Sequence, residues 1–132
     1  MSVELRWLNV EHTILFYDVR GVWTWADMYA AVVRAHNIMD TLDHTVHSIV
    51  DMSAAGRMGD NPLTHGRRLG AATHPRAGLS IFIQAPAFMR VLFGTLGRLN
   101  PQLKYRIQFA STREEALAVI EEAQAVETRV LA

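Results

Sequence analysis

The sequence contains no cysteine among its 132 residues, which excludes disulfide bonds and thiolate chemistry. It also lacks a long hydrophobic run, because its runs stay below about ten residues and a membrane-spanning helix needs about twenty. Neither sign of charge predominates, since 13 basic residues balance 13 acidic ones, and a nucleic-acid-binding chain needs a basic face. The N-terminus does not have the charged and then hydrophobic layout of a signal peptide. We therefore expect a cytoplasmic protein that neither spans a membrane nor binds nucleic acid.

The composition that remains is typical of one globular domain. Hydrophobic residues make up 50% of the chain and charged residues 20%, which is enough apolar material to bury a core. A chain of 132 residues is long enough for one core and too short for two ordinary domains. We expect a single domain over residues 1–132.

The first half of the chain predicts a hairpin, a helix and a buried strand. Alternating hydrophobicity indicates a strand at residues 3–8, and a short link to the apolar segment 13–19 indicates an antiparallel partner. Helical spacing after Thr24, a residue suited to capping, predicts a helix over residues 25–41. The apolar segment 46–52 predicts a third strand.

The second half predicts strands that alternate with helices. A helix with two glycines is expected from Asp60 or Asn61 to about residue 73, a central strand at 79–84 and a helix from Pro86 to about residue 100. The alternation in residues 104–109 predicts an edge strand, and Ser111 or Thr112 is expected to cap the last helix. The order β-β-α-β-α-β-α-β-α favours an α/β fold with a mainly parallel five-stranded sheet and an antiparallel N-terminal edge strand.

The loop after the third strand is the predicted functional segment. The strand ends at Asp51, small and polar residues follow, and Asp60-Asn61-Pro62 is a sequence suited to opening a helix. Ligands and partners of open α/β sheets bind at the carboxyl ends of strands. The side chains that we expect to contact a partner are those of Asp51, Ser53, Arg57, Asp60 and Asn61.

The order of elements and the segment Ile49-Val50-Asp51-Met52-Ser53 resemble the STAS domain, the SpoIIAA-like fold of the anti-sigma factor antagonists. The chain is more closely similar to a divergent bacterial branch of STAS-like proteins. The shared features are Gly21-Val22-Trp23-Thr24-Trp25 before the first helix and Thr112-Arg113-Glu114-Glu115-Ala116 at the start of the last. The resemblance covers about residues 3–127, and it implies a non-enzymatic regulatory domain that binds another protein.

The same resemblance implies a departure at the regulatory position. In the antagonist family, a serine at the start of the second helix is phosphorylated by a partner kinase. Asp60 occupies that position here, and Asn61 replaces the neighbouring serine. Phosphorylation adds about −1.5 to −2 charge, and Asp60 already carries a fixed negative charge. The alternatives that remain open are a constitutive binder with Asp60 as a phosphate mimic, Asp60 as a simple helix cap, and a switch elsewhere, such as Ser53.

No set of residues predicts a metal site, a cofactor or a reaction. The histidines at 36, 44, 47, 65 and 74 do not follow the spacing of a known metal motif. Asp18 and Asp51 both fall on predicted strands, but an aspartate that closes a strand commonly satisfies loop N–H groups. We expect neither a metal nor a cofactor, and we expect no catalytic residues.

The helix expected from Pro86 is apolar on nearly every side. Such a helix is covered on more than one face, and an exposed apolar patch marks an interface. We expect Phe88, Met89, Leu92 and Phe93 to form an apolar interface, most simply in a homodimer. The alternative is a carrier of a small apolar ligand or lipid, with a pocket between this helix and the glycine-containing helix before it.

Overall fold

The computed structural model describes residues 2–131, which form five strands and five helices. In chain order these are β1 (Val3–Trp7), β2 (Ile14–Gly21), α1 (Trp25–Met39), β3 (Val46–Ala55), α2 (Pro62–Ala71), β4 (Ala77–Ile83), α3 (Ala87–Leu99), α4 (Pro101–Arg106), β5 (Ile107–Ala110) and α5 (Arg113–Leu131).

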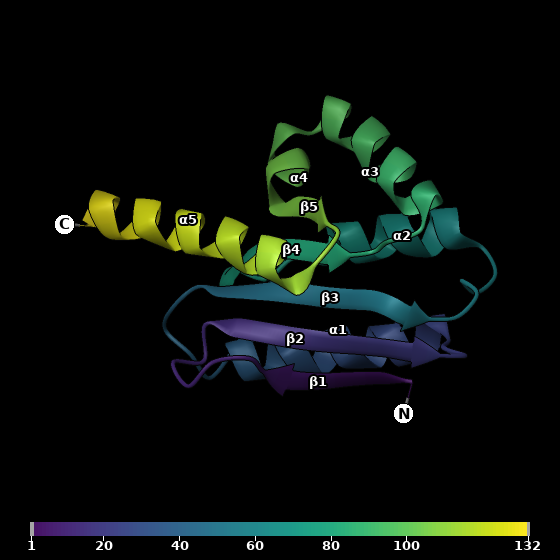
Figure 1. Ribbon diagram of the computed structural model, residues 1–132, viewed down its shortest axis with the longest axis horizontal. Helices are drawn as coiled ribbons and strands as arrows, with labels where there is room; N and C mark the ends of the chain where they lie inside the picture. The colour runs from purple at the N-terminus through teal and green to yellow at the C-terminus, as the bar shows by residue number, and fades with distance from the viewer. Residues whose placement is uncertain (1, 132) are drawn as a thin grey trace.

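The strands form one mixed sheet in the order β1-β2-β3-β4-β5 (Figure 1). Strand β1 pairs with β2 in the antiparallel direction, and all other neighbours are parallel. The predicted α/β fold is therefore confirmed, including the antiparallel edge strand at the N-terminus. Strand β4 lies inside the sheet and β5 at its edge, as the sequence predicts.

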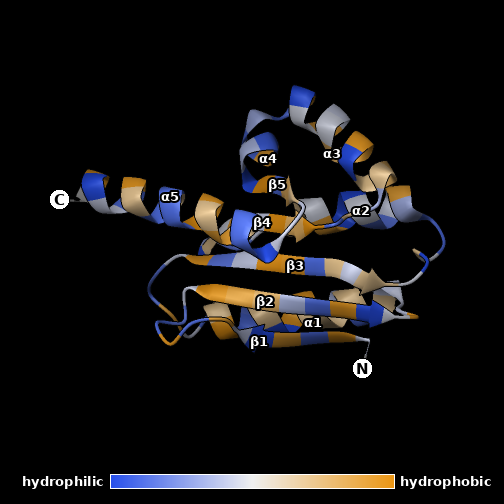
Figure 2. Cartoon of the chain, in the orientation of Figure 1, coloured by the Kyte–Doolittle hydropathy of each residue, from blue (hydrophilic) through white to orange (hydrophobic). Residues whose placement is uncertain are grey.

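The two faces of the sheet are covered by different helices. Side chains alternate between the faces of a strand, so neighbouring residues of β2 belong to separate cores. Tyr17 packs in one cluster with residues of α1, whereas Phe16 packs in the other with Ile120 of α5. Helices α1 and α2 lie behind the sheet in Figure 1, and α5 lies in front of it. Strand β2 is hydrophobic where it begins and hydrophilic where it ends (Figure 2).

Two helices begin with capping boxes: α5 at the box that the sequence predicts, and α1 at Thr24, which the sequence predicts as a cap. The Thr24 hydroxyl accepts a hydrogen bond from the Asp27 N–H at 3.1 Å, and the Asp27 carboxylate accepts one from the Thr24 N–H. Thr112 and Glu115 make the same reciprocal pair before α5. Each reciprocal pair satisfies two N–H groups that have no partner inside the helix.

The start of α2 differs from the prediction. Asn61 is the N-cap residue, but its side chain makes no cap hydrogen bond, and its backbone is left-handed with φ 57°. Asparagine is one of the few residues that tolerate this conformation. Asn61 therefore supports the turn before α2 through its backbone and does not cap the helix with its amide.

The predicted strand over residues 104–109 is wrong in its first half. Asn100 accepts hydrogen bonds from the N–H groups of Gln102 and Leu103, and this cap opens the short helix α4. Residues 104–106 are consequently helical, and β5 begins only at Ile107. Arg106 is therefore the last residue of α4 and not a strand residue.

Candidate functional site

A cavity of about 370 Å³ lies between the sheet and helices α1 to α4. Its floor is the face of β2, β3 and β4 that carries Tyr17, Val50 and Phe82. Pockets that hold small organic molecules commonly measure about 300–1,000 Å³. The cavity is thus large enough to be a ligand site, and it is the candidate site of this protein.

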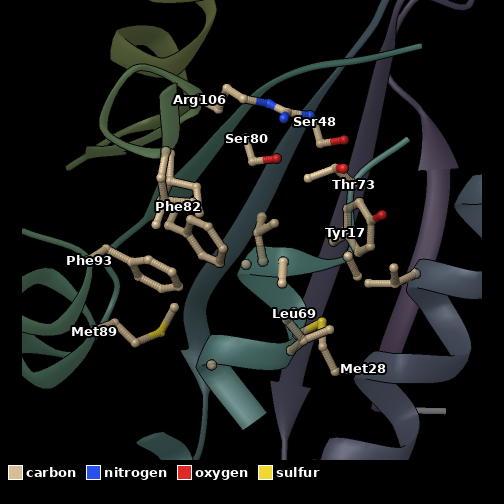
Figure 3. Close-up of a pocket in the computed structure, with 18 of the residues that line it drawn as sticks. Tyr17, Met28, Ser48, Leu69, Thr73, Ser80, Phe82, Met89, Phe93 and Arg106 are labelled. Atoms are coloured by element: carbon tan, nitrogen blue, oxygen red, sulfur yellow. The ribbon is translucent and has the colours of Figure 1, made fainter. Parts of the chain in front are cut away.

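Most of the cavity wall is apolar, and it is rich in methionine. Methionine is unbranched and adapts its shape to an irregular partner. In Figure 3, Met28, Leu69, Met89 and Phe93 lie on the lower side of the cavity. The further apolar side chains of the wall are those of Val32, Met39, Val50, Met52, Met58, Phe82, Leu92 and Leu103.

Polar side chains gather on one side of the same cavity. Ser48 and Ser80 are direct neighbours in the pairing of β3 with β4, so both lie in one row across the sheet. Figure 3 shows Ser48, Ser80, Thr73, Tyr17 and Arg106 together on the upper side. The cavity therefore has one apolar side and one side that offers hydroxyl groups and a guanidinium group.

Tyr17 stays protonated over the whole physiological pH range. Burial raises the pKa of its hydroxyl to about 12, although the neighbouring Ser48 hydroxyl and the charge of Arg34 act in the opposite direction. A buried phenolate would lose its hydration, which favours the neutral form. The Tyr17 hydroxyl is thus a hydrogen-bond donor to any acceptor in the cavity.

Arg106 brings the positive charge to the polar side. It is the last residue of α4, directly before β5, and in Figure 3 its guanidinium group lies beside Ser48 and Ser80. None of the ion pairs found within residues 2–131 includes Arg106. Among the described residues that line the cavity, it is the one side chain with a permanent charge.

Aromatic side chains form the wall near the start of α1. Trp23 and Trp25 meet edge to face at 4.9 Å, and Trp25 stacks on His65 of α2 at 5.1 Å. The Tyr29 hydroxyl lies 2.8 Å from Nδ1 of His65, which ties α1 to α2. Within the described chain, the buried indole N–H groups of Trp23 and Trp25 have no hydrogen-bond partner. A ligand acceptor that reaches this wall would find two free donors.

A second depression adjoins the polar side of the cavity. It shares Thr73, Ala77, Gly78, Gln102 and Arg106 with the cavity, and it is also lined by His74, Tyr105 and Glu127. Because the same arginine lines both spaces, the polar side of the cavity is the side that lies next to this surface depression.

His47 lies at the base of this depression. Its Nδ1 accepts a hydrogen bond from the Leu79 N–H at 2.9 Å, and its Nε2 lies 3.3 Å from a carboxylate oxygen of Glu127. Burial lowers the pKa of His47, and the Glu127 carboxylate partly opposes that effect. His47 thus joins β3 and β4 to the C-terminal half of α5.

The four predicted interface residues of α3 lie at the cavity. Met89, Leu92 and Phe93 line it, and Phe93 is only 7% exposed because it packs against Phe82 and Phe109. Phe88 also lines the cavity but is 45% exposed. The exposed large hydrophobic side chains of α3 are those of Phe88, Val91 and Leu99. A homodimer through this helix stays a prediction, with Val91 in place of Phe93 as the outward residue.

The predicted partner-binding loop lies at the surface. Ser53, Arg57, Asp60 and Asn61 are exposed, and the Asp51 carboxylate accepts a hydrogen bond from the Ser53 N–H at 2.9 Å. The structure corrects the predicted loop in its first part, because β3 extends to Ala55 and therefore includes Asp51, which is partly exposed, and Ser53. Arg57, Asp60 and Asn61 lie in the loop between β3 and α2. None of them lines the cavity.

The two strand aspartates considered for acid–base chemistry are neighbours in the sheet. Asp18 and Asp51 are paired in the register of β2 with β3. Asp18 is buried and pairs with Arg20 at 2.9 Å and with Arg6 at 3.5 Å. These arginines neutralise Asp18, so it acts as a structural ion pair. Among residues 2–131, no three histidine or acidic side chains gather as potential metal ligands.

Sequence reasoning missed the polar side of the cavity. Ser48 and Ser80 are 32 positions apart in the sequence, and only the parallel pairing of their strands brings them together. Arg106 was assigned to an edge strand, where an arginine is normally solvated. The available signal was Asn100-Pro101, the same asparagine–proline pair that opens α2, because such a pair can begin a helix as well as follow one.

Comparisons of the chain with protein-family models, with curated proteins and with solved structures give no match. Within the described residues, no helix has the length and apolar character to cross a membrane.

Proposed function

We propose that this protein binds a small, mainly apolar molecule between its sheet and helices α1 to α4. The observation that carries the proposal is the cavity of about 370 Å³ with its methionine- and phenylalanine-rich wall. An apolar molecule that enters such a space loses contact with water, and each buried methylene contributes about 0.8 kcal/mol. The proposed activity is binding, with no chemical step.

Tryptophan fluorescence tests this proposal directly, because Trp23 and Trp25 line the cavity. We expect decanol to change the fluorescence in a saturable way. Val50→Phe should abolish the response, since Val50 lies on the floor of the cavity and a phenyl group would fill the space. Val33→Phe is the matched control, because Val33 is 58% exposed on α1 and does not line the cavity. A native protein that gives no saturable response would contradict the proposal.

The finer fold assignment is a further part of the proposal. We infer a STAS-like domain, and the support is the order of elements together with the sequential sheet order and the antiparallel edge strand. As a member of that class, the protein would act in regulation through contact with another protein.

The exposed loop supports a second candidate function, which is partner binding. Asp60 is exposed, and the start of α2 uses no side-chain cap, so this carboxylate is not required by the helix. Asp60→Ala should therefore leave the free energy of unfolding within about 0.5 kcal/mol of the native value. It should also remove protein partners that co-purify with the native chain. Asp43→Ala is the control, because Asp43 is fully exposed in a different loop. Retention of every partner by the folded Asp60→Ala variant would refute this role.

A further inference from the structure

We propose that the ligand of the cavity is a monocarboxylate, with its carboxylate held by Arg106 and its hydrocarbon part held by the methionine and phenylalanine wall. The inference deepens the proposed function and rests on it. It assigns the two sides of the cavity to the two ends of one amphipathic molecule, such as a medium-chain fatty acid.

The charge of the cavity wall is the first argument. Arg106 is partly buried, no ion pair within residues 2–131 includes it, and no acidic residue lines the cavity. A charge that is withdrawn from water is costly unless an opposite charge accompanies it. A bound anion would supply that opposite charge at the polar side.

The donors around Arg106 are the second argument. The guanidinium group is a planar fork that matches the two oxygens of a carboxylate. Ser48 and Ser80 lie beside it in one row of the sheet, and the Tyr17 hydroxyl stays protonated because burial raises its pKa to about 12. All of these groups donate hydrogen bonds, and a carboxylate is a group that only accepts them.

The amount of charge favours a carboxylate over a phosphate monoester. A phosphate monoester carries about −1.5 to −2 charges near neutral pH, whereas a carboxylate carries one. Arg106 supplies the one permanent positive charge of the wall, because Arg34, whose charge acts on Tyr17, lies outside the wall. His36, the one histidine among the described residues of the wall, is held toward its neutral form because burial lowers its pKa. A monoanion is thus the ligand whose charge this wall balances.

The position of Arg106 also suits an amphipathic ligand. Arg106 and Thr73 line both the cavity and the adjoining surface depression. The carboxylate end would consequently lie next to the surface, while the hydrocarbon end extends toward Met28, Leu69 and Phe93. In this orientation the charged end remains near water and the apolar end is buried.

Calorimetric titration of the purified full chain with decanoate, decanol and decyl phosphate at neutral pH tests the inference. These probes share one hydrocarbon chain and differ in the head group. We expect decanoate to bind at least about tenfold more tightly than decanol, because a hydrogen bond to a charged group contributes about 1.5–3 kcal/mol. We expect decyl phosphate to bind more weakly than decanoate.

Variants then assign the preference to the polar side. Arg106→Gln should bring the affinity for decanoate to within about threefold of that for decanol, since the contact with the charged head group is lost. Ser80→Ala should reduce the preference by a smaller factor, about two- to tenfold. Lys104→Gln is the matched control, because it removes one charge from the same helix at an exposed residue outside the cavity. This control should bind all three probes as the native chain does.

The outcomes separate the inference from the proposed function. If decanol binds as tightly as decanoate, or if Arg106→Gln keeps the preference, the monocarboxylate assignment is wrong and apolar binding stands. Tighter binding of decyl phosphate than of decanoate also overturns the assignment. If none of the probes binds, both the assignment and the proposed function are overturned. The affinities of the three probes for the native protein test the monocarboxylate assignment even if a variant does not fold.

Discussion

At the scale of single residues, the buried ring of His47 leaves no room for a side chain at position 78, so this position requires glycine. A Cβ atom at position 78 would lie 2.4 Å from Nδ1 and 2.6 Å from Cε1 of that ring. The ring cannot move away easily, because it is 2% exposed and its Nδ1 accepts a hydrogen bond from the Leu79 N–H. The absence of a side chain at position 78 is thus a packing requirement of β4.

We predict that Gly78→Ala lowers the free energy of unfolding by about 1–3 kcal/mol, which is the usual cost of overpacking a core. Urea unfolding measures the change. Gly94→Ala is the control in the same chain, because a Cβ at position 94 of α3 meets nothing within 4 Å. The control should be neutral or stabilising, by up to about 1 kcal/mol. Equal effects of the two substitutions would show that the contact with His47 does not constrain β4.

Asn61 shows why a residue pattern alone misassigns a role. The sequence Asp60-Asn61-Pro62 correctly predicts that a helix begins there, since α2 starts at Pro62. The pattern does not reveal the backbone angle, and φ 57° makes Asn61 a turn residue whose side chain forms no cap. The choice between cap and turn depends on the path of the loop between β3 and α2, which the local sequence does not determine.

At the scale of elements, α5 is joined to the sheet through the buried His47 and through Glu127, whose side chain is 45% exposed. Their side chains approach to 3.3 Å, and burial lowers the pKa of His47 below its usual value. The folded chain therefore binds fewer protons than the unfolded chain as the pH falls below about 6.5. The contribution of His47 to stability is present in full above that pH, and it is lost as the pH falls through the lower pKa of the folded state.

We predict that the native protein loses more free energy of unfolding than His47→Asn does between about pH 7.5 and pH 5. The amide oxygen of the introduced asparagine would replace Nδ1 as an acceptor for the Leu79 N–H, and this side chain would not titrate. His36 acts in the same direction in both proteins, so the difference between their pH profiles isolates His47. Parallel profiles from urea unfolding at several pH values would exclude His47 as the titrating group.

Glu127→Gln provides the complementary variant. The Glu127 carboxylate raises the pKa of His47, so its removal lowers that pKa further. The variant should consequently be more sensitive to acid than the native protein. An unchanged sensitivity would indicate that the two groups do not interact in solution.

The segment between α3 and β5 marks the limit of element prediction. Residues 104–109 alternate between polar and apolar, which fits a strand with one exposed face. The Asn100 side chain accepts hydrogen bonds from two N–H groups and stabilises a short helix in the first part of this segment. The helix cap at Asn100 thus determines the structure of residues 104–106, although their alternating pattern is typical of a strand. The starts of α1 and α5 were predictable from the sequence. In each case a threonine is followed three residues later by an acidic residue with which it exchanges hydrogen bonds.

At the scale of the whole molecule, the sequence predicts the sheet better than it predicts the cavity. Each strand except β5 has a strong local pattern of hydrophobic residues. The short link between β1 and β2 indicates that these two strands are antiparallel. The cavity depends on the register between β3 and β4 and on the place of Arg106, both of which are properties of the assembled fold. The predicted pocket between α2 and α3 did anticipate part of the wall, because Leu69, Leu92 and Phe93 line the cavity.

The assembled fold also decides how a homodimer can be tested. Phe93 is buried against Phe82, so its replacement by glutamate would disrupt the core and not an interface. Val91 is 69% exposed on the outward side of α3. We predict that the native protein is dimeric in light scattering and that Val91→Glu is a folded monomer. Val33→Glu, at an exposed residue of α1, should remain dimeric. A native protein that is monomeric at every concentration would refute the homodimer.

Occupation of the cavity should stabilise the entire domain, because its wall is built from β2, β3, β4 and helices α1 to α4. A ligand that binds only the folded chain adds about 2.7 kcal/mol of stability when its concentration is one hundred times its Kd. For a domain of this size we expect decanoate at that concentration to raise the Tm by roughly 5–15 °C. Val50→Phe should show no such rise at the same concentration, whereas Val33→Phe should respond as the native protein does. A Tm that rises equally in both variants would mean that decanoate binds outside the cavity, since Val50 lies on the cavity floor and Val33 does not line the cavity.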